Sequence, residues 1–167
     1  MPQEENVVHP IPPVFNENSK ILILGSFPSV KSRDVGFFYG HKQNRFWRVL
    51  SSLLNAATPE STEEKKALLL SNGIALWDVI ASCTIVGSAD SSIKDVVAND
   101  ISKILKSGVK AVFTNGKTAS ALYRKYIQPN IGIEDICLPS TSPTNAAFSF
   151  EILINEWSVI KKYLSGE

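Results

Sequence analysis

Short apolar runs that alternate with helical segments constrain the fold of this chain more than any other feature of its sequence. Each run has four to six residues and is followed by polar residues, glycine or proline, as is typical of strands buried on both faces. The runs cover residues 21–24, 74–77, 109–113 and 133–138. Because strands and helices alternate, we predict a three-layer α/β/α fold with a central, mostly parallel four-stranded sheet and helices on both faces.

Helical periodicity fills the segments between these runs. Apolar residues recur at spacings of three and four after Asn44, and Ser61 with Glu64 has the form of a capping box. Asn72 and Gly73 form a plausible stop for the second helix. We predict five helices, over residues 46–54, 61–72, 100–107, 117–126 and 148–164.

The beginning of the chain differs in composition from the rest. Residues 1–19 are polar and rich in proline, which disfavours regular structure. We therefore predict an N-terminal arm over residues 1–19, lying across the surface, and a single domain over residues 20–167. With 167 residues, 44% of them hydrophobic, the chain is long enough to bury one substantial core.

Composition excludes several classes of protein. The 17 Lys and Arg residues nearly balance 16 Asp and Glu residues, so any binding to nucleic acid must come from a local patch. Cys83 and Cys137 form no CxxC motif, so we expect no disulfide framework, no metal and no cofactor. No targeting segment is evident and no run reaches the roughly 20 apolar residues of a membrane helix. We expect a soluble, intracellular monomer that does not bind membranes.

Candidate functional residues follow the predicted strands. In parallel sheets, ligands bind beyond the carboxyl ends of the strands, here residues 25–29, 78–92, 115–117 and 139–145. The first and last of these loops are rich in Gly, Ser, Thr and Pro and could present N–H groups and hydroxyls to phosphate or carbonyl oxygens. The alternative is that they are ordinary turns.

Residues 31–48 combine cations with aromatic rings, a pairing that can neutralise phosphates while stacking bases. The only acidic residue among them is Asp34. Phe46 and Trp47 also fit the apolar face of the following helix, so a core position is the alternative for them. The basic and the remaining aromatic residues are Lys31, Arg33, Lys42, Arg45, Arg48, Phe37, Phe38 and Tyr39.

Three blocks, together with the segment 113–117, resemble motifs of the uracil-DNA glycosylase superfamily. The blocks are Gly25-Ser26-Phe27-Pro28-Ser29, residues 39–47 with the pattern His-x-x-Asn-Arg-Phe-Trp, and residues 138–145. Their order and spacing agree over roughly residues 20–164, and the hypoxanthine-DNA glycosylase family is the most similar. The resemblance implies a monofunctional DNA repair enzyme that flips a deaminated base out of DNA and hydrolyses its bond to deoxyribose.

One departure from the superfamily pattern affects the catalytic assignment. The mismatch-specific relatives carry a catalytic Asn where this chain has Phe27, which cannot orient water by hydrogen bonding. The resemblance to the hypoxanthine family implies that Asn44 replaces it as the group that orients water. His41 and Asp78 are secondary candidates, because a His can titrate near neutral pH and an Asp could order water.

The resemblance also implies binding roles. We expect the loop of residues 140–145 to grip the DNA backbone, and one of Phe37, Phe38 and Tyr39 to stack the extruded base. The expected substrate-binding residues are Gly25, Ser26, Phe27, Pro28, Phe38 and Tyr39. The expected DNA-binding residues are Ser29, Lys31, Arg33, Arg45, Ser140, Thr141, Ser142, Pro143 and Asn145.

Three alternatives remain at this point. Within the superfamily, the substrate could be uracil or mismatched thymine instead of hypoxanthine. The loss of the usual catalytic Asn at position 27 also allows a DNA-damage-binding module without activity. A nucleotide-binding doubly wound domain is the third, although neither GxGxxG nor GxxxxGK[ST] is present.

Overall fold

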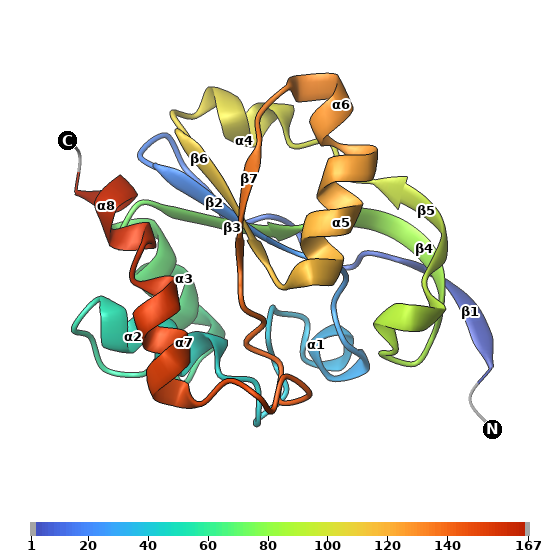
Figure 1. The fold of residues 1–167 in the computed structure, drawn as a ribbon, viewed down its shortest axis with the longest axis horizontal. Helices are drawn as coiled ribbons and strands as arrows, with labels where there is room; N and C mark the ends of the chain where they lie inside the picture. The colour runs from blue at the N-terminus through green and yellow to red at the C-terminus, as the bar shows by residue number, and fades with distance from the viewer. Residues whose placement is uncertain (1–2, 166–167) are drawn as a thin grey trace.

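Two β-sheets form the framework of the computed structural model, which describes residues 3–165 (Figure 1). The larger sheet has four parallel strands in the order β3-β2-β6-β7. They are β2 (Ile21–Gly25), β3 (Ile74–Asp78), β6 (Ala111–Asn115) and β7 (Asp135–Leu138). The four predicted strands and their parallel arrangement are confirmed, although β6 and β7 each begin two residues later than predicted.

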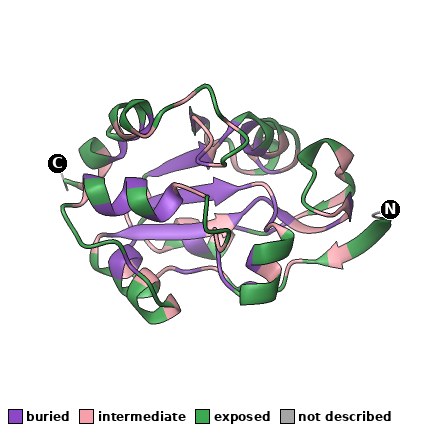
Figure 2. Cartoon of the chain, turned by 90° about the horizontal axis from the view of Figure 1, so that it is seen from below, coloured by how far each residue is buried: buried purple, intermediate pink, exposed green. Residues whose placement is uncertain are grey.

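Helices cover both faces of the larger sheet because its strands are apolar on both sides. Ile21 and Ile23 of β2 pack into one core cluster, whereas Leu22 and Leu24 pack into the other. The first face carries α2 (Phe46–Leu53), α3 (Thr62–Ser71), α7 (Phe150–Trp157) and α8 (Ile160–Leu164). The second carries α4 (Ser102–Lys106), α5 (Lys117–Tyr126) and α6 (Gln128–Ile131). The predicted three-layer arrangement is confirmed, and Figure 2 shows the buried strands between helices whose outer faces are exposed.

The predicted helices are present, with one interruption. The segment predicted as a single helix over residues 148–164 is divided into α7 and α8. At the division the hydroxyl of Ser158 donates to the carbonyl of Asn155 at 2.6 Å, a local bond that competes with regular helix geometry. The short helix α1 (Val30–Val35) and the 3-10 turn η1 (Asp90–Ser92) were not predicted.

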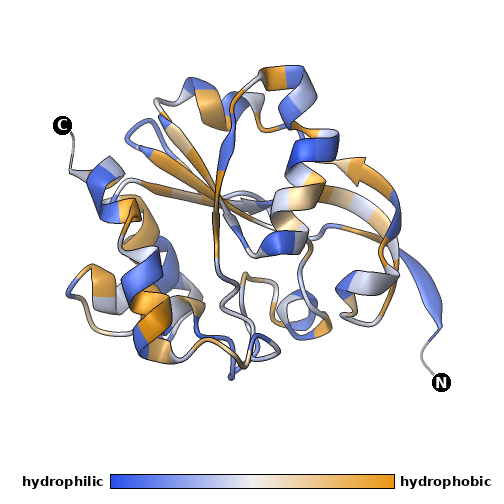
Figure 3. Cartoon of the chain, viewed as in Figure 1, coloured by the Kyte–Doolittle hydropathy of each residue, from blue (hydrophilic) through white to orange (hydrophobic). Residues whose placement is uncertain are grey.

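The smaller sheet is the main departure from the sequence prediction. It has three antiparallel strands in the order β1-β4-β5, formed by β1 (Glu4–Val8), β4 (Ile80–Val86) and β5 (Lys94–Ala98). The prediction of irregular structure throughout residues 1–19 was wrong for residues 4–8. Residues 78–92 are predicted as a loop, but Ile80–Val86 form β4 and Asp90–Ser92 form η1. Figure 3 shows why the signal was weak: β1 is largely hydrophilic, unlike the apolar strands of the larger sheet.

The segment after β1 connects the two sheets. The backbone N–H of His9 donates to the carbonyl of Ala81 at 2.7 Å, and Val14 forms an isolated antiparallel bridge with Leu76 of β3. Pro10, Pro12 and Pro13, which disfavour regular structure, lie between these two anchors. Residues 9–14 therefore run along the molecule from one sheet to the other.

None of the helices formed by residues 3–165 combines the length and the apolar character needed to cross a membrane.

Candidate active site

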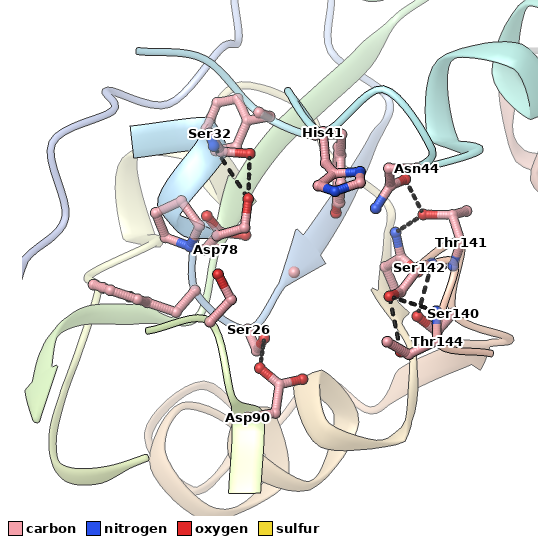
Figure 4. A pocket seen from close by; sticks show the side chains of 18 of the residues that line it. Ser26, Ser32, His41, Asn44, Asp78, Asp90, Ser140, Thr141, Ser142 and Thr144 are labelled. Atoms are coloured by element: carbon pink, nitrogen blue, oxygen red, sulfur yellow. Dashed lines mark hydrogen bonds between the residues drawn. The ribbon is translucent and has the colours of Figure 1, made fainter. Parts of the chain in front are cut away.

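A pocket of about 420 Å³ opens at the carboxyl ends of the parallel strands (Figure 4). Each of the four loops predicted to follow these strands contributes to its lining, and so does the segment that leads into α2. The lining includes Gly25, Ser26, Phe27, Ser29, Phe38, Tyr39, His41, Asn44, Asp78, Asp90, Asn115, Ser140, Thr141, Ser142 and Pro143. The prediction that these loops meet at one edge of the sheet is confirmed.

Asn44 is held on one wall of the pocket by its carbonyl oxygen. Its Oδ1 accepts hydrogen bonds from the backbone N–H of Phe46 at 3.0 Å and from the hydroxyl of Thr141 at 2.8 Å. The bond from Phe46 satisfies an N–H group at the start of α2, which would otherwise lack an intrahelical acceptor. The side chain of Asn44 therefore fixes its own orientation while it supports the helix.

The neighbouring hydrogen bonds determine which amide atom of Asn44 faces the pocket. The backbone N–H of Thr141 donates to Asn115 Oδ1 at 3.0 Å, and Asn115 Nδ2 donates to Thr141 Oγ1 at 3.0 Å. The hydroxyl proton of Thr141 is then directed to Asn44 Oδ1, because that oxygen is the remaining acceptor. A flipped Asn44 amide would lose both bonds, so the pattern assigns Nδ2 as the atom pointing into the pocket (Figure 4).

Asp78 forms the opposite wall and lies close to the backbone of β2. It is paired in register with Gly25 at the ends of the two strands. A Cβ on Gly25 would collide with Asp78 Oδ1 and would lie 3.0 Å from the hydroxyl of Tyr39. Glycine is therefore required here so that both polar side chains can approach the strand.

His9 is the buried partner of Asp78, and sequence reasoning missed it. Its Nε2 lies 2.8 Å from Asp78 Oδ2, and the two side chains are 3% and 5% exposed. The ring packs near Phe27, Phe38 and Trp77, with centroid distances of 5.8, 6.1 and 6.2 Å. Because no periodic pattern marks His9, only the fold reveals its place behind the pocket.

Tyr39 contributes a hydroxyl that makes no hydrogen bond to any residue in the range 3–165. The ring stacks on Phe46 at a centroid distance of 4.2 Å, and the backbone is left-handed with a φ of 53°. Burial and the nearby carboxylate of Asp78 raise the pKa of Tyr39 above its usual value. The hydroxyl therefore stays neutral and keeps its proton as a donor.

Two further ionisable groups lie at the rim. His41 Nδ1 accepts the backbone N–H of Gln43 at 3.1 Å, so this His also supports the turn that leads into α2. Asp90 is exposed and accepts a hydrogen bond from Ser26 Oγ at 3.3 Å (Figure 4). Within residues 3–165, no three His, Cys, Asp or Glu side chains are arranged as a metal-binding group.

A family model described as the uracil DNA glycosylase superfamily matches residues 12–159. The chain belongs to this superfamily.

Relatives with high coverage support the assignment. The chain is 35% identical over 155 residues to the hypoxanthine DNA glycosylase of Methanosarcina acetivorans, covering 91% of this chain and 96% of that protein. It is 36% identical over 137 residues to the hypoxanthine DNA glycosylase of Methanosarcina barkeri, covering 80% of this chain and 85% of that protein. A solution NMR structure of a candidate uracil DNA glycosylase from M. acetivorans matches with a TM-score of 0.78 and 34% identity, over 92% of this chain and 96% of the other.

Phe27 lies in the loop that follows β2. Its side chain lines the pocket, is 9% exposed, and packs edge-on against His9 with an interplanar angle of 83°. The guanidinium of Arg33 lies 5.7 Å from the centre of the ring on another side. Phe27 therefore shapes this superfamily pocket as an apolar surface, and Asn44 presents the free amide.

Two of the residues expected to contact DNA, Arg33 and Arg45, make hydrogen bonds within the protein. The guanidinium of Arg45 donates to the carbonyls of Thr141, Phe148, Ser142 and Asn145. Arg33 donates to the carbonyl of Gly87 at 2.8 Å. Both side chains therefore hold loops in place within the protein, and contact of either residue with DNA stays a prediction.

The other expected DNA-binding residues divide by exposure. Thr141 is fully buried and Asn145 Nδ2 donates to the carbonyl of Ser140 at 3.0 Å, so both support the loop from inside. Lys31 is exposed outside the pocket. Of the expected DNA-binding residues, the pocket is lined by Ser29, Ser140, Thr141, Ser142 and Pro143.

The aromatic residues expected to stack a base are largely packed. Phe37 is 2% exposed and does not line the pocket, which excludes it as the stacking residue in this arrangement. Phe38 is also 2% exposed, but part of its side chain forms the pocket wall together with Phe27. Tyr39 also lines the pocket, so the rings available to a base are those of Phe27, Phe38 and Tyr39.

Proposed function

We propose that this protein is a monofunctional DNA glycosylase that extrudes a deaminated base from DNA and hydrolyses its N-glycosidic bond. The observation that carries the proposal is the fixed amide of Asn44, whose Nδ2 points into a pocket formed by the loops that resemble superfamily motifs. The pocket volume of about 420 Å³ lies in the range of sites that enclose small ligands. An extruded base is a ligand of this kind.

The reaction requires the base to leave with the electron pair of its bond to C1′. A water oxygen bonds to C1′ and the bond from C1′ to the base nitrogen breaks. One proton of the water stays on the new C1′ hydroxyl, and the other passes, directly or through solvent, to the departing base. Because Asn44 Oδ1 already accepts two hydrogen bonds, the Nδ2–H group is the part of this amide left for catalysis. A fixed donor stabilises negative charge on the leaving base without reorganisation.

This role differs from the one expected from the sequence, in which Asn44 orients water. Both roles assign catalysis to the same residue. The donor role follows from the hydrogen bonds of Thr141 and Phe46, which the sequence does not reveal.

Hypoxanthine is the proposed substrate. Two relatives that the chain matches over most of its length are named hypoxanthine DNA glycosylases. Uracil and mismatched thymine are the alternatives within the superfamily. We further propose that the protein works as a monomer inside the cell, where its DNA substrate is located.

The substrate proposal is tested by an excision panel. Oligonucleotides with hypoxanthine, uracil, xanthine or mismatched thymine are incubated with the protein in single- and double-stranded form, and abasic sites are cleaved with alkali. Excision of hypoxanthine at the highest single-turnover rate is expected. Retardation of these DNAs without abasic sites would show a damage-binding module instead of an enzyme.

The catalytic proposal is tested with Asn44→Asp. This variant keeps an oxygen for the bonds from Phe46 and Thr141 but loses the Nδ2–H donor. We expect single-turnover excision to fall by about 10²-fold, as removal of one fixed donor can cause, with little change in thermal stability. Asn130→Asp, at an exposed position in α6, introduces the same charge and should excise normally. An Asn44→Asp enzyme with normal rates would exclude the donor role.

A further inference from the structure

His9 is held in place from both sides along the chain. On one side, β1 pairs with β4 through Val8 and Ser82, and the backbone of His9 donates to Ala81. On the other side, Trp77 Nε1 donates to the carbonyl of Ile11 at 3.1 Å. The imidazole therefore reaches Asp78 from a fixed backbone, and it does so from the rear of the pocket.

The hydrogen bonds of His9 assign its tautomer. Its Nδ1 accepts the backbone N–H of Ile11 at 3.1 Å, so this nitrogen carries no proton. The proton of the neutral ring is then on Nε2, which donates to Asp78 Oδ2 at 2.8 Å. A buried carboxylate is costly unless it is hydrogen-bonded, and His9 supplies such a bond.

The second carboxylate oxygen of Asp78, Oδ1, is available to accept a hydrogen bond from a ligand. Oδ2 accepts from His9, whereas Oδ1 accepts no hydrogen bond from the described residues and faces Gly25 in the pocket lining. Of the carboxylates that line the pocket, Asp78 is buried and Asp90 is exposed at the rim. An ionised carboxylate can only accept hydrogen bonds. The inner wall of the pocket therefore presents an acceptor with a fixed direction.

Deamination changes a base in a way that such an acceptor can detect. Adenine has a lone pair at N1, whereas hypoxanthine has an N1–H group beside its new carbonyl, and uracil likewise gains N3–H relative to cytosine. On the assumption that the proposed function is correct, we propose that the His9–Asp78 pair recognises this ring N–H through Asp78 Oδ1. The same oxygen repels the lone pair at N1 of adenine.

The position of Asp78 favours recognition of the base over contact with the attacking water. In a nucleotide that enters from the surface, C1′ stays near the mouth of the pocket, and the pairing edge of the base lies farthest inside. The Asp78 side chain is only 5% exposed and touches the strand backbone at Gly25. His9 is thus a positioning residue that acts through Asp78.

The decisive variant is Asp78→Asn. Because His9 Nε2–H requires an acceptor, the new amide must turn its oxygen toward His9 and its NH2 group toward the pocket. The side chain at position 78 then presents a hydrogen-bond donor to the pocket instead of an acceptor. We expect affinity to shift from inosine toward adenosine by at least about tenfold, because sites built to hydrogen-bond one partner discriminate strongly against the other.

The measurement is affinity for single-stranded oligonucleotides that contain 2′-fluoroarabino-inosine or 2′-fluoroarabino-adenosine, whose glycosidic bonds resist hydrolysis. The ratio of the two affinities does not depend on catalysis. Asp95→Asn is the matched control, because Asp95 is exposed in β5, and it should leave the ratio unchanged. If Asp78→Asn lowers excision but the affinity ratio stays constant, Asp78 acts on water and the proposal is wrong.

The contribution of His9 is tested by its coupling to Asp78. In the double variant His9→Leu/Asp78→Asn the amide is no longer oriented, so the gain in adenosine affinity should be lost. His9→Gln in the natural background retains a donor and should preserve inosine preference better than His9→Leu. Independent effects of the two positions would refute the role of His9. If the wild-type protein prefers inosine but excises no base, the proposed function fails while the recognition proposal stands.

Discussion

Gly25 determines how closely the walls of the pocket can approach each other. A methyl group at this position would collide with Asp78 Oδ1 and crowd the hydroxyl of Tyr39. For Gly25→Ala we expect a loss of about 1–3 kcal/mol in the free energy of unfolding from overpacking. We also expect excision to fall by about 10²-fold, since displacement of a positioned group by about 1 Å can have this effect. Urea denaturation and single-turnover kinetics measure the two changes.

Gly40→Ala provides the comparison for Gly25→Ala. A Cβ on Gly40 would meet its nearest neighbours, in Ser32 and Val35, at 3.4 Å, an ordinary contact distance. The backbone of Gly40 also has no left-handed φ. Equal losses in the two alanine variants would mean that close approach to Asp78 is unimportant.

At the scale of single residues, sequence reasoning identified much of the pocket but not its hydrogen bonds. Asn44, Asp78 and His41 all line the pocket as expected. The partner of Asp78 was missed because His9 lies 69 positions away in a segment without periodicity. The direction of the Asn44 amide depends on Thr141, whose position becomes known only from the fold.

Among the elements, the loop after β7 depends on Arg45 for its shape. Arg45 precedes α2, and its guanidinium binds four carbonyls between residues 141 and 148. In Arg45→Lys a single ammonium group cannot satisfy this planar set of acceptors. We expect a loss of about 1–3 kcal/mol in stability and faster proteolysis of the loop. Thermal unfolding and limited proteolysis are the measurements.

A second variant, Arg45→Ala, distinguishes a structural role from contact with DNA. Because Lys keeps the positive charge and Ala does not, the salt dependence of DNA binding should be measured for Arg45→Ala. A residue that neutralises one phosphate contributes about one unit to the slope of log K against log salt concentration. We expect the slope for Arg45→Ala to equal that of the wild type. The stability control for Arg45→Lys is Arg48→Lys, which changes an exposed position of α2 and should leave the stability unchanged.

Asp135 links β6, α5 and β7 and makes stability depend on pH. Burial alone would raise the pKa of Asp135, but hydrogen bonds from Thr114, Arg124 and Ser120 outweigh it and hold the pKa below its usual value. A depressed carboxyl pKa stabilises the fold above the unfolded value of about 3.9, and this contribution is lost as pH falls through the folded value.

We therefore expect Asp135→Asn to lower the free energy of unfolding by about 2–3 kcal/mol at pH 7. The exposed side chain of Arg124 contributes little of this amount. The difference between wild type and variant should shrink as the pH is lowered toward 3. Urea denaturation at several pH values is the measurement, and a difference that stays constant with pH would contradict this account.

The two sheets show which elements the sequence could predict. Strands of the larger sheet are buried on both faces, so they are continuous apolar runs such as Ile21–Gly25. Strands of the smaller sheet have exposed positions, and β1 consists of Glu4, Glu5, Asn6, Val7 and Val8, most of them exposed. Pairing with β4 makes this segment a strand, and that contact is absent from any local pattern.

For the molecule as a whole, the N-terminal segment is a structural part of the pocket. Removal of residues 1–8 would leave His9 in the chain but remove the strand that anchors it. We expect excision to fall by about tenfold or more because His9 is no longer fixed. The midpoint of thermal unfolding should fall by only about 2–4 °C, since most of β1 is exposed. Activity equal to that of the full chain would show that β1 does not position His9.

Strand β1 pairs on one side only, at the edge of the smaller sheet (Figure 1). Edge strands fray more readily than central ones, and their amides exchange with solvent sooner. While residues 4–8 are detached from β4, the imidazole of His9 is no longer held behind the pocket. Selectivity for the damaged base therefore depends on how often β1 opens. Among variants that weaken the pairing of β1, those with faster deuterium uptake in residues 4–8 should also show a higher affinity for adenosine relative to inosine.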